Sequence, residues 1–297
     1  GRKRRIMIPS AKIAVIGGSG VYDLDGLQDV QQVSVATPWG APSDEITVGT
    51  LGETQIAFLP RHGRHHKFLP TEVPYQANIY ALRMMGVERL LSVSAVGSLA
   101  EEYAPGDFVL IDQFIDRTYR RQQTFFGGGI VAHFPLADPV DSKMIQVVAD
   151  EAKALEQLKV HVGGTYVTME GPQFSTRAES ELYRSWGAKI IGMTNGTEAK
   201  LAREAGMGFC TIAMVTDYDC WHPSHDDVDV ELIVQTAMSN SKKVRDLLLS
   251  CLEPLAALGP SEWRDALVGS VMTPKEFWSP EAIAKTEALF DHIPVAG

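Results

Sequence analysis

The chain has 297 residues, of which 45% are hydrophobic and 22% are charged, a composition typical of an ordinary globular protein. Its formal net charge of -10 argues against proteins that need a basic face, so we expect it to bind neither nucleic acid nor a membrane surface. The sequence has no run of about 18 apolar residues and no apolar segment behind its basic start, which predicts a cytoplasmic protein.

The first half of the chain alternates apolar, strand-like runs with helical patterns. The expected strands cover residues 12–20, 46–60 (two strands joined by a turn), 88–99 and 106–116. Helical spacing of apolar residues predicts helices over 71–86 and 142–158.

The second half continues this alternation. Expected strands cover residues 163–171, 188–195 and 208–217, and expected helices cover 197–206, 228–252 and 280–290. A capping box, Thr176 with Glu179, predicts a further helix that begins at Arg177. Strands that alternate with helices and are apolar on both faces predict an α/β fold, with a mixed, mostly parallel twisted sheet covered by helices.

The domain organisation follows from the absence of any linker or repeat in the sequence. We expect residues 1–297 to form a single domain, with 1–10 disordered and 254–297 as a C-terminal helical extension. The three cysteines lack zinc-binding spacing and are expected to be reduced thiols.

Ligands of open α/β sheets bind where strands end, so the residues behind each expected strand are candidates for chemistry. The glycine-rich turn 17–20 lacks the third glycine of a dinucleotide site and the lysine of a phosphate-binding loop. The loop 61–66, Arg-His-Gly-Arg-His-His, is compatible with a metal site, a solvated basic loop or an anion site. In an acidic chain, this cationic loop favours the anion.

Asp217 and Asp219 follow an apolar strand directly, on either side of Tyr218. Buried carboxylates need partners, and a hydrogen bond to a helix N-terminus would be the structural explanation. The functional explanation is recognition of an amino group beside a ring nitrogen, with one carboxylic acid able to donate a proton.

Together, the strand ends predict a ligand with a phosphate-sized anion at one end and an amino-substituted heteroaromatic base at the other. The expected anion pocket contains Ser19, Arg61, His62, Ser94 and Thr194. The strand ends also provide an aromatic ring and a methionine, Phe174 and Met193, besides the two aspartates.

These motifs resemble those of the 5'-methylthioadenosine phosphorylases, within the trimeric purine nucleoside phosphorylase superfamily. The resemblance rests on IGGSG, RHGRHH, PYQANIYALR, SAVGSL, PGDFVLIDQFIDRT, EGPQFSTRAES, GMTN and VTDYDCW, which extend from about residue 12 to 253. It implies phosphorolysis of 5'-methylthioadenosine to adenine and 5-methylthioribose 1-phosphate in a homotrimer. Phosphate is the implied co-substrate, and no metal or organic cofactor is implied.

The resemblance also implies a role for individual residues. Phosphate would be bound by Ser19, Arg61, His62, Ser94, Ala95 and Thr194. The nucleoside would be bound by Phe174, Ser175, Met193, Val230, Val234, the catalytic residues Asp217 and Asp219, and His133 of a neighbouring subunit. Asp217 would face N7 of adenine, Asp219 would bind the exocyclic amine, and the valines would favour a methylthio group over a hydroxyl.

One segment departs from the family pattern. The family usually has a proline before Glu198, whereas this chain has Gly196-Thr197. We expect Thr197 to cap the helix that follows, and the glycine to loosen the neighbourhood of Thr194.

Three alternatives remain open at this stage. A nucleosidase would replace phosphate with water and would not need Arg61 and His62. A purine nucleoside phosphorylase of broader specificity would accept adenosine, or 6-oxopurine nucleosides if the residue at 217 were an amide. A catalytically silent nucleoside-binding protein would bind without turnover.

Overall fold

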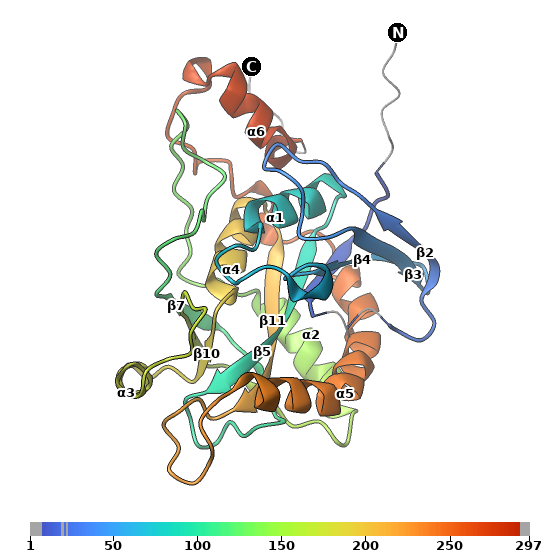
Figure 1. Cartoon of the computed structure of the whole chain (residues 1–297). Helices are drawn as coiled ribbons and strands as arrows, with labels where there is room; N and C mark the ends of the chain where they lie inside the picture. The colour runs from blue at the N-terminus through green and yellow to red at the C-terminus, as the bar shows by residue number, and fades with distance from the viewer. Residues whose placement is uncertain (1–7, 19–20, 22, 292–297) are drawn as a thin grey trace.

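The computed structural model describes residues 8–18, 21 and 23–291. Seven of the ten positions at which disorder was expected, and Ser19 of the expected anion pocket, therefore lie outside the described residues. Within the described part, one eleven-stranded sheet forms the centre of a single domain, with helices on both sides (Figure 1). The α/β fold expected from the sequence is confirmed.

The strands have three to ten residues, and most of them are fully or largely buried. They are β1 (Ile13–Gly17), β2 (Gln28–Val33), β3 (Ile46–Leu51), β4 (Thr54–Pro60), β5 (Arg89–Ser98), β6 (Phe108–Leu110), β7 (Gln113–Asp116), β8 (Val160–Val162), β9 (Thr165–Thr168), β10 (Ile190–Gly192) and β11 (Gly208–Asp217). Six of the ten strand pairings among the described residues are parallel, which confirms a mixed, mostly parallel sheet.

Six α-helices are described. They are α1 (Tyr75–Met84), α2 (Ser142–Lys153), α3 (Arg177–Ser185), α4 (Asn195–Glu204), α5 (Val230–Ala257) and α6 (Pro280–Phe290). The predicted capping box is present at α3, where the Thr176 hydroxyl accepts from the Glu179 N–H and the Glu179 carboxylate accepts from the Thr176 N–H. Helix α1 packs against α4 on one side of the sheet, and α2 packs against α5 on the other (Figure 1).

The sheet divides at β5, which is the strand that positions the site. The first part of β5 lies between β1 and β11 in parallel register, and its end, Gly97–Ser98, turns to pair antiparallel with β10. One branch continues through β11, β6 and β8, and the other through β10, β9 and β7. The carboxyl ends of β1, β4, β5 and β11 therefore meet at one edge of the sheet, where ligands of such sheets bind.

Three differences from the sequence-based expectation have simple causes. Residues 106–116 are not one strand, because β6 pairs with β11 and β8 while β7 pairs with β9. Helix α5 continues through Pro254 to Ala257, so the expected boundary at 254 falls inside a helix. Strands β2 and β8 were not predicted, since β2 is polar and almost fully exposed and β8 has three residues.

Among the described residues, no helix has the length and apolar character needed to cross a membrane. The same residues contain no group of three or more histidines, cysteines or acids suited to a metal ion. Cys210, Cys220 and Cys251 are buried free thiols, as expected.

Candidate active site

The expected anion pocket lies at the ends of β4 and β5 and at the start of α4. Arg61 is 4% exposed and forms a two-point ion pair with Glu198, with Nε to Oε2 at 2.7 Å and Nη2 to Oε1 at 3.0 Å. In addition, Nη1 donates to the Val93 carbonyl at 3.1 Å, and Nη2 also donates to the Ser92 hydroxyl at 2.8 Å. Burial acts to lower the pKa of Arg61, but Glu198 raises it overall, so the guanidinium stays charged inside the protein.

His62 lies beside this ion pair and is neutral at pH 7. Burial, followed by the charge of Arg61, lowers the pKa of His62 to about 4. Its Nδ1 is 2.8 Å from the Phe68 carbonyl oxygen, and since a carbonyl only accepts, Nδ1 carries the proton. Nε2 of the neutral ring is consequently an acceptor. The ring stacks on His66 with centroids 4.1 Å apart.

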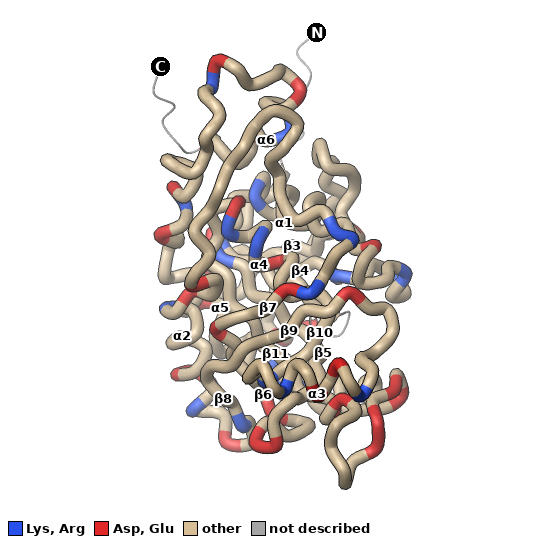
Figure 2. The backbone as a smooth tube through the Cα atoms, turned by 90° about the vertical axis from the view of Figure 1, so that its left-hand side faces the viewer, with Lys and Arg blue, Asp and Glu red and all other residues tan. Residues whose placement is uncertain are grey.

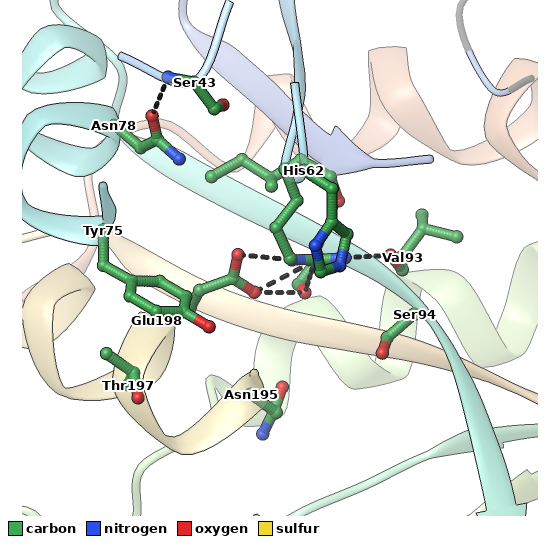
Figure 3. A network of polar contacts seen from close by, with 12 residues as sticks. Ser43, His62, Tyr75, Asn78, Val93, Ser94, Asn195, Thr197 and Glu198 are labelled. Atoms are coloured by element: carbon green, nitrogen blue, oxygen red, sulfur yellow. Dashed lines mark hydrogen bonds and ion pairs between the residues drawn. The ribbon is translucent and has the colours of Figure 1, made fainter. Parts of the chain in front are cut away.

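Figure 3 shows Tyr75 and His62 beside the ion pair that Glu198 forms, with Ser94 on the neighbouring strand and Asn195 and Thr197 on the adjoining turn of α4. Ser94 and Thr194 are buried, whereas Ala95 is the one exposed residue of β5. The strand is thus open to a ligand at the point where the sequence predicted one. Thr194 occupies the N-cap position of α4, where a helix favours a negative group.

The two aspartates lie at the end of β11, and a strand irregularity explains their placement. The pairing of β11 with β5 shifts between Val215 and Asp217, which brings Asp217 opposite Gly97. A Cβ at Gly97 would come within 2.9 Å of Asp217 Oδ1, so the approach requires glycine. The Asp217 carboxylate accepts from the Thr216 hydroxyl at 2.6 Å and from the Asp219 N–H at 2.8 Å.

Neither aspartate forms an ion pair with a described residue. Burial raises the pKa of Asp217 to about 6, and the two hydrogen bonds offset only part of this effect. Burial also raises the pKa of Asp219 above its usual range. A carboxyl with a pKa of about 6 is suited to donate a proton near neutral pH.

Two loops approach the aspartates. The Cys220 thiol donates to the Ser175 carbonyl at 3.7 Å, which brings the loop carrying Phe174 and Ser175 beside Asp219. The Val228 N–H donates to the Asp219 carbonyl at 2.9 Å, and α5 begins two residues later. Val230 and Val234 are exposed on the first turns of α5.

The structure does not gather His133 with these residues. It is exposed, its N–H donates to the Ser270 carbonyl at 2.9 Å, and the preceding Ala132 pairs with Val271. His133 therefore belongs to an outer segment that packs against the C-terminal part of the chain.

The expectation that Thr197 caps a helix is wrong. Helix α4 begins at Asn195, Thr194 is its N-cap residue, and Thr197 lies fully buried in the first turn. Its hydroxyl accepts instead from Arg121 Nη1 at 3.3 Å. Gly196 is also fixed, because its N–H donates to the Thr168 hydroxyl at 3.0 Å.

Sequence reasoning missed two buried ion pairs, the one between Arg61 and Glu198 and the one between Arg121 and Glu170. In Figure 2, Lys and Arg positions gather around α1, α4 and β4, whereas Asp and Glu positions gather at the end of the molecule near α3. Buried cations need carboxylate partners, so the cationic loop in the sequence already indicated that buried carboxylates exist. Nothing in the spacing showed which carboxylates they are.

The family model of the phosphorylase superfamily matches residues 12–253. The chain belongs to the phosphorylase superfamily. Among its relatives in this superfamily is the S-methyl-5'-thioadenosine phosphorylase of Gloeobacter violaceus, 53% identical over 272 residues, which are 90% of this chain and 91% of the relative. The enzyme of the same name from Cereibacter sphaeroides is 52% identical over 93% of this chain and 96% of its own.

Solved structures of superfamily members have the same fold. A methylthioadenosine phosphorylase from an Antarctic soil metagenomic library is 44% identical, with a TM-score of 0.91 over 95% of this chain and 99% of its own. A mutant adenosine/methylthioadenosine phosphorylase of Schistosoma mansoni, in complex with methylthioadenosine, is 34% identical, with a TM-score of 0.80 over 88% and 96% of the two chains.

Proposed function

We propose that the protein is a 5'-methylthioadenosine phosphorylase that produces adenine and 5-methylthioribose 1-phosphate. The observation that carries this proposal is a pair of buried aspartates at the end of β11, Asp217 and Asp219, which have no cationic partner among the described residues. Such acids match the N7 and the exocyclic amine of adenine. Relatives that are about half identical to this chain are named S-methyl-5'-thioadenosine phosphorylase, which supports the proposal.

The proton leaves from Asp217. As the bond between C1' and N9 breaks, its electron pair moves into the purine, and N7 takes the proton from the Asp217 carboxyl. Adenine thus leaves as a neutral molecule, while the sugar gains oxocarbenium character. Asp219 binds the amine, and Phe174 and Ser175 line the base. A raised pKa of about 6 keeps part of Asp217 protonated at neutral pH.

Phosphate attacks C1' from the other end of the site. In this proposal it is bound by Arg61, His62, Ser94, the Ala95 backbone and Thr194, with Ser19 as a further contact. Because Nε2 of neutral His62 is an acceptor, we assign it the P–OH hydrogen of hydrogen phosphate. The phosphate oxygen that forms the new bond to C1' replaces N9, which balances the reaction.

The remaining roles concern the 5' end and the assembly. Met193 contacts the ribose, Val230 and Val234 contact the methylthio group, and His133 reaches the site of a neighbouring subunit in a cytoplasmic homotrimer. The exposure of His133 and of the two valines supports this, since each would gain contacts from a ligand or a neighbour.

Adenosine is the second candidate substrate, because a neighbour with 34% identity is named an adenosine/methylthioadenosine phosphorylase. A 6-oxopurine is disfavoured, since Asp219, which accepts from the amine of adenine, would meet its carbonyl oxygen with another acceptor. Arg61 alone does not exclude a nucleosidase, because Glu198 already neutralises it.

The decisive experiment measures adenine release from 5'-methylthioadenosine with and without phosphate, with adenosine and inosine in parallel. We expect release that requires phosphate, weaker turnover of adenosine and none of inosine. Release that is independent of phosphate would identify a hydrolase, and binding without release would identify a silent protein.

A further inference from the structure

Arg121 has a buried side chain that contacts three separate segments of the chain, at Tyr75, at Glu170 and at Met193 to Thr197. Its side chain is 1% exposed. Nη1 donates to the Met193 carbonyl and, at 3.2 Å, to the Tyr75 hydroxyl at the start of α1. Nη1 also lies 3.3 Å from the Thr197 hydroxyl in the first turn of α4.

The other donors of Arg121 bind Glu170, which follows β9. Nε donates to Glu170 Oε2 at 2.7 Å, and Nη2 donates to the Glu170 carbonyl at 3.0 Å. The Glu170 carboxylate also accepts from the Thr71 hydroxyl at 2.5 Å and from the Tyr119 and Arg120 N–H groups at 2.9 and 2.8 Å. The pair is therefore fully hydrogen-bonded, which a buried ion pair requires.

These contacts join the two loops on which the nucleoside would rest. Gly171, directly behind Glu170, has φ of +69°, and a Cβ there would lie 2.5 Å from Met193 Sδ. The segment from Glu170 to Phe174 and the segment from Met193 to Thr194 are thus packed together and also bound through one guanidinium.

We propose that Arg121 is a positioning residue, which acts through the Met193 carbonyl and Glu170 to set the ribose and phosphate contacts against the base loop. The inference rests on the proposed phosphorolysis. Arg121 need not touch the ligand. A planar guanidinium that forms five contacts fixes both the orientation and the distance of the segments it binds. A lysine offers a single point charge and does not fix their orientation in this way.

Thr197 extends this connection to helix α4. Its hydroxyl accepts from Arg121, whereas a proline at this position, which the family resemblance predicts, offers no side-chain acceptor. The threonine thus ties the first turn of α4, which carries Thr194 and Glu198, to the same guanidinium.

The test compares two buried arginines. Arg89, at the opposite end of β5, forms an ion pair with Asp141 at 2.9 Å and is equally buried. We expect Arg121→Lys and Arg89→Lys to lower the Tm alike. Only Arg121→Lys should lower kcat/KM for 5'-methylthioadenosine, by about 100-fold, because small misplacements of reacting groups cost this much.

The affinity for adenine alone, measured by calorimetry, separates positioning from general damage. Adenine depends on the aspartates at the end of β11, so Arg121→Lys should leave its affinity within about threefold. The proposal is overturned if kcat/KM is unchanged, or if adenine affinity falls as far as kcat/KM. Failure of the unmodified protein to release adenine would instead overturn the proposed function.

A milder pair of variants covers the case in which Arg121→Lys does not fold. Thr197→Val removes the acceptor and keeps the shape, and we expect kcat/KM to fall about fivefold. Thr197→Ser restores the hydroxyl and should restore kcat/KM. Equal activity of all three proteins would show that the contact does not position the site.

Discussion

The two ends of the proposed site treat buried charge in opposite ways. At the phosphate end, Arg61 is neutralised by Glu198, and His62 has lost its charge because its pKa is lowered to about 4. At the base end, Asp217 and Asp219 have no cation among the described residues, and burial raises the pKa of both.

This difference shows where the protein and where the ligand provide compensation. A charge that is already paired within the protein gains little further interaction free energy when a ligand binds. An unpaired acid is costly in the free protein and gains most when a donor arrives. We therefore expect the base end to control chemistry, and the phosphate end to depend more on a fixed arrangement.

Asp217→Asn should give the largest effect, because it removes the proton donor at the unpaired end. We expect kcat/KM for 5'-methylthioadenosine to fall by about 100-fold or more. An asparagine NH₂ donates to a 6-oxo group, so the ratio of inosine to methylthioadenosine activity should rise. Steady-state kinetics with both substrates measure this, and an unchanged ratio would refute the assigned role of Asp217.

Glu198→Gln tests the paired end. Removing one partner of a buried ion pair should reduce the free energy of unfolding by about 3 kcal/mol. If Arg61 faces phosphate, the anion then replaces the missing charge, and phosphate should raise the Tm of this variant more than that of the unmodified protein. Thermal unfolding across a phosphate series decides this. Arg89, whose ion pair lies at the other end of β5, provides the control through Asp141→Asn, in which phosphate should have no added effect.

The parts of the fold that could be predicted are those with a local signal in the sequence. Strand β11 and helix α6 have the bounds expected from a continuous apolar run and from the Ser279-Pro280 start. Strand β2, Gln-Asp-Val-Gln-Gln-Val, has no apolar pattern and is held by backbone pairing with β3, so no local signal marks it. Residues 106–116 looked like one strand because the apolar β6 is followed after a short gap by Phe114 and Ile115 of β7.

In the site, too, the sequence predicted residues that belong to a local motif and missed contacts between distant residues. The aspartates were predictable, because two acids that follow an apolar strand are unusual within one short motif. The partners of Arg61 and Arg121 were not, since Glu198 and Glu170 lie 137 and 49 residues away in sequence. Thr197 was assigned to a cap because a helix start is a local pattern, whereas its contact with Arg121 depends on the folded chain.

The pH dependence of kcat/KM tests the role of Asp217 at the base end of the site, with a smaller expected effect than the substitutions above. Asp217 donates only when protonated, so kcat/KM should fall about tenfold per unit as the pH rises above about 6. Its contribution to stability has the same sign. Because the carboxyl pKa is raised in the folded protein, stability falls as the pH rises from the ordinary value of an aspartate to about 6, and it levels off above that. Glu170 has the opposite sign. Burial would raise its pKa, but hydrogen bonds lower it to about 2, so its contribution is lost as the pH falls below the unfolded value.

Asp217→Asn is the control for this profile. Free phosphate also titrates near neutral pH, and it does so for both the unmodified protein and the variant. Only the part of the decline in kcat/KM that disappears in Asp217→Asn therefore belongs to Asp217. A limb above pH 6 that persists in Asp217→Asn would assign it to phosphate and remove the support for Asp217 as the acid.

Val230→Thr should have the smallest effect, since it changes only the 5' end. The substitution keeps the shape and offers a hydroxyl to adenosine, so the ratio of methylthioadenosine to adenosine kcat/KM should fall about fivefold. Val268→Thr is a matched control, because both valines are 66% exposed. If Val230→Thr leaves the ratio as Val268→Thr does, α5 does not contact the 5' substituent. Discrimination between the two nucleosides would then rest on a neighbouring subunit, for which substitution of the exposed His133 is the direct comparison.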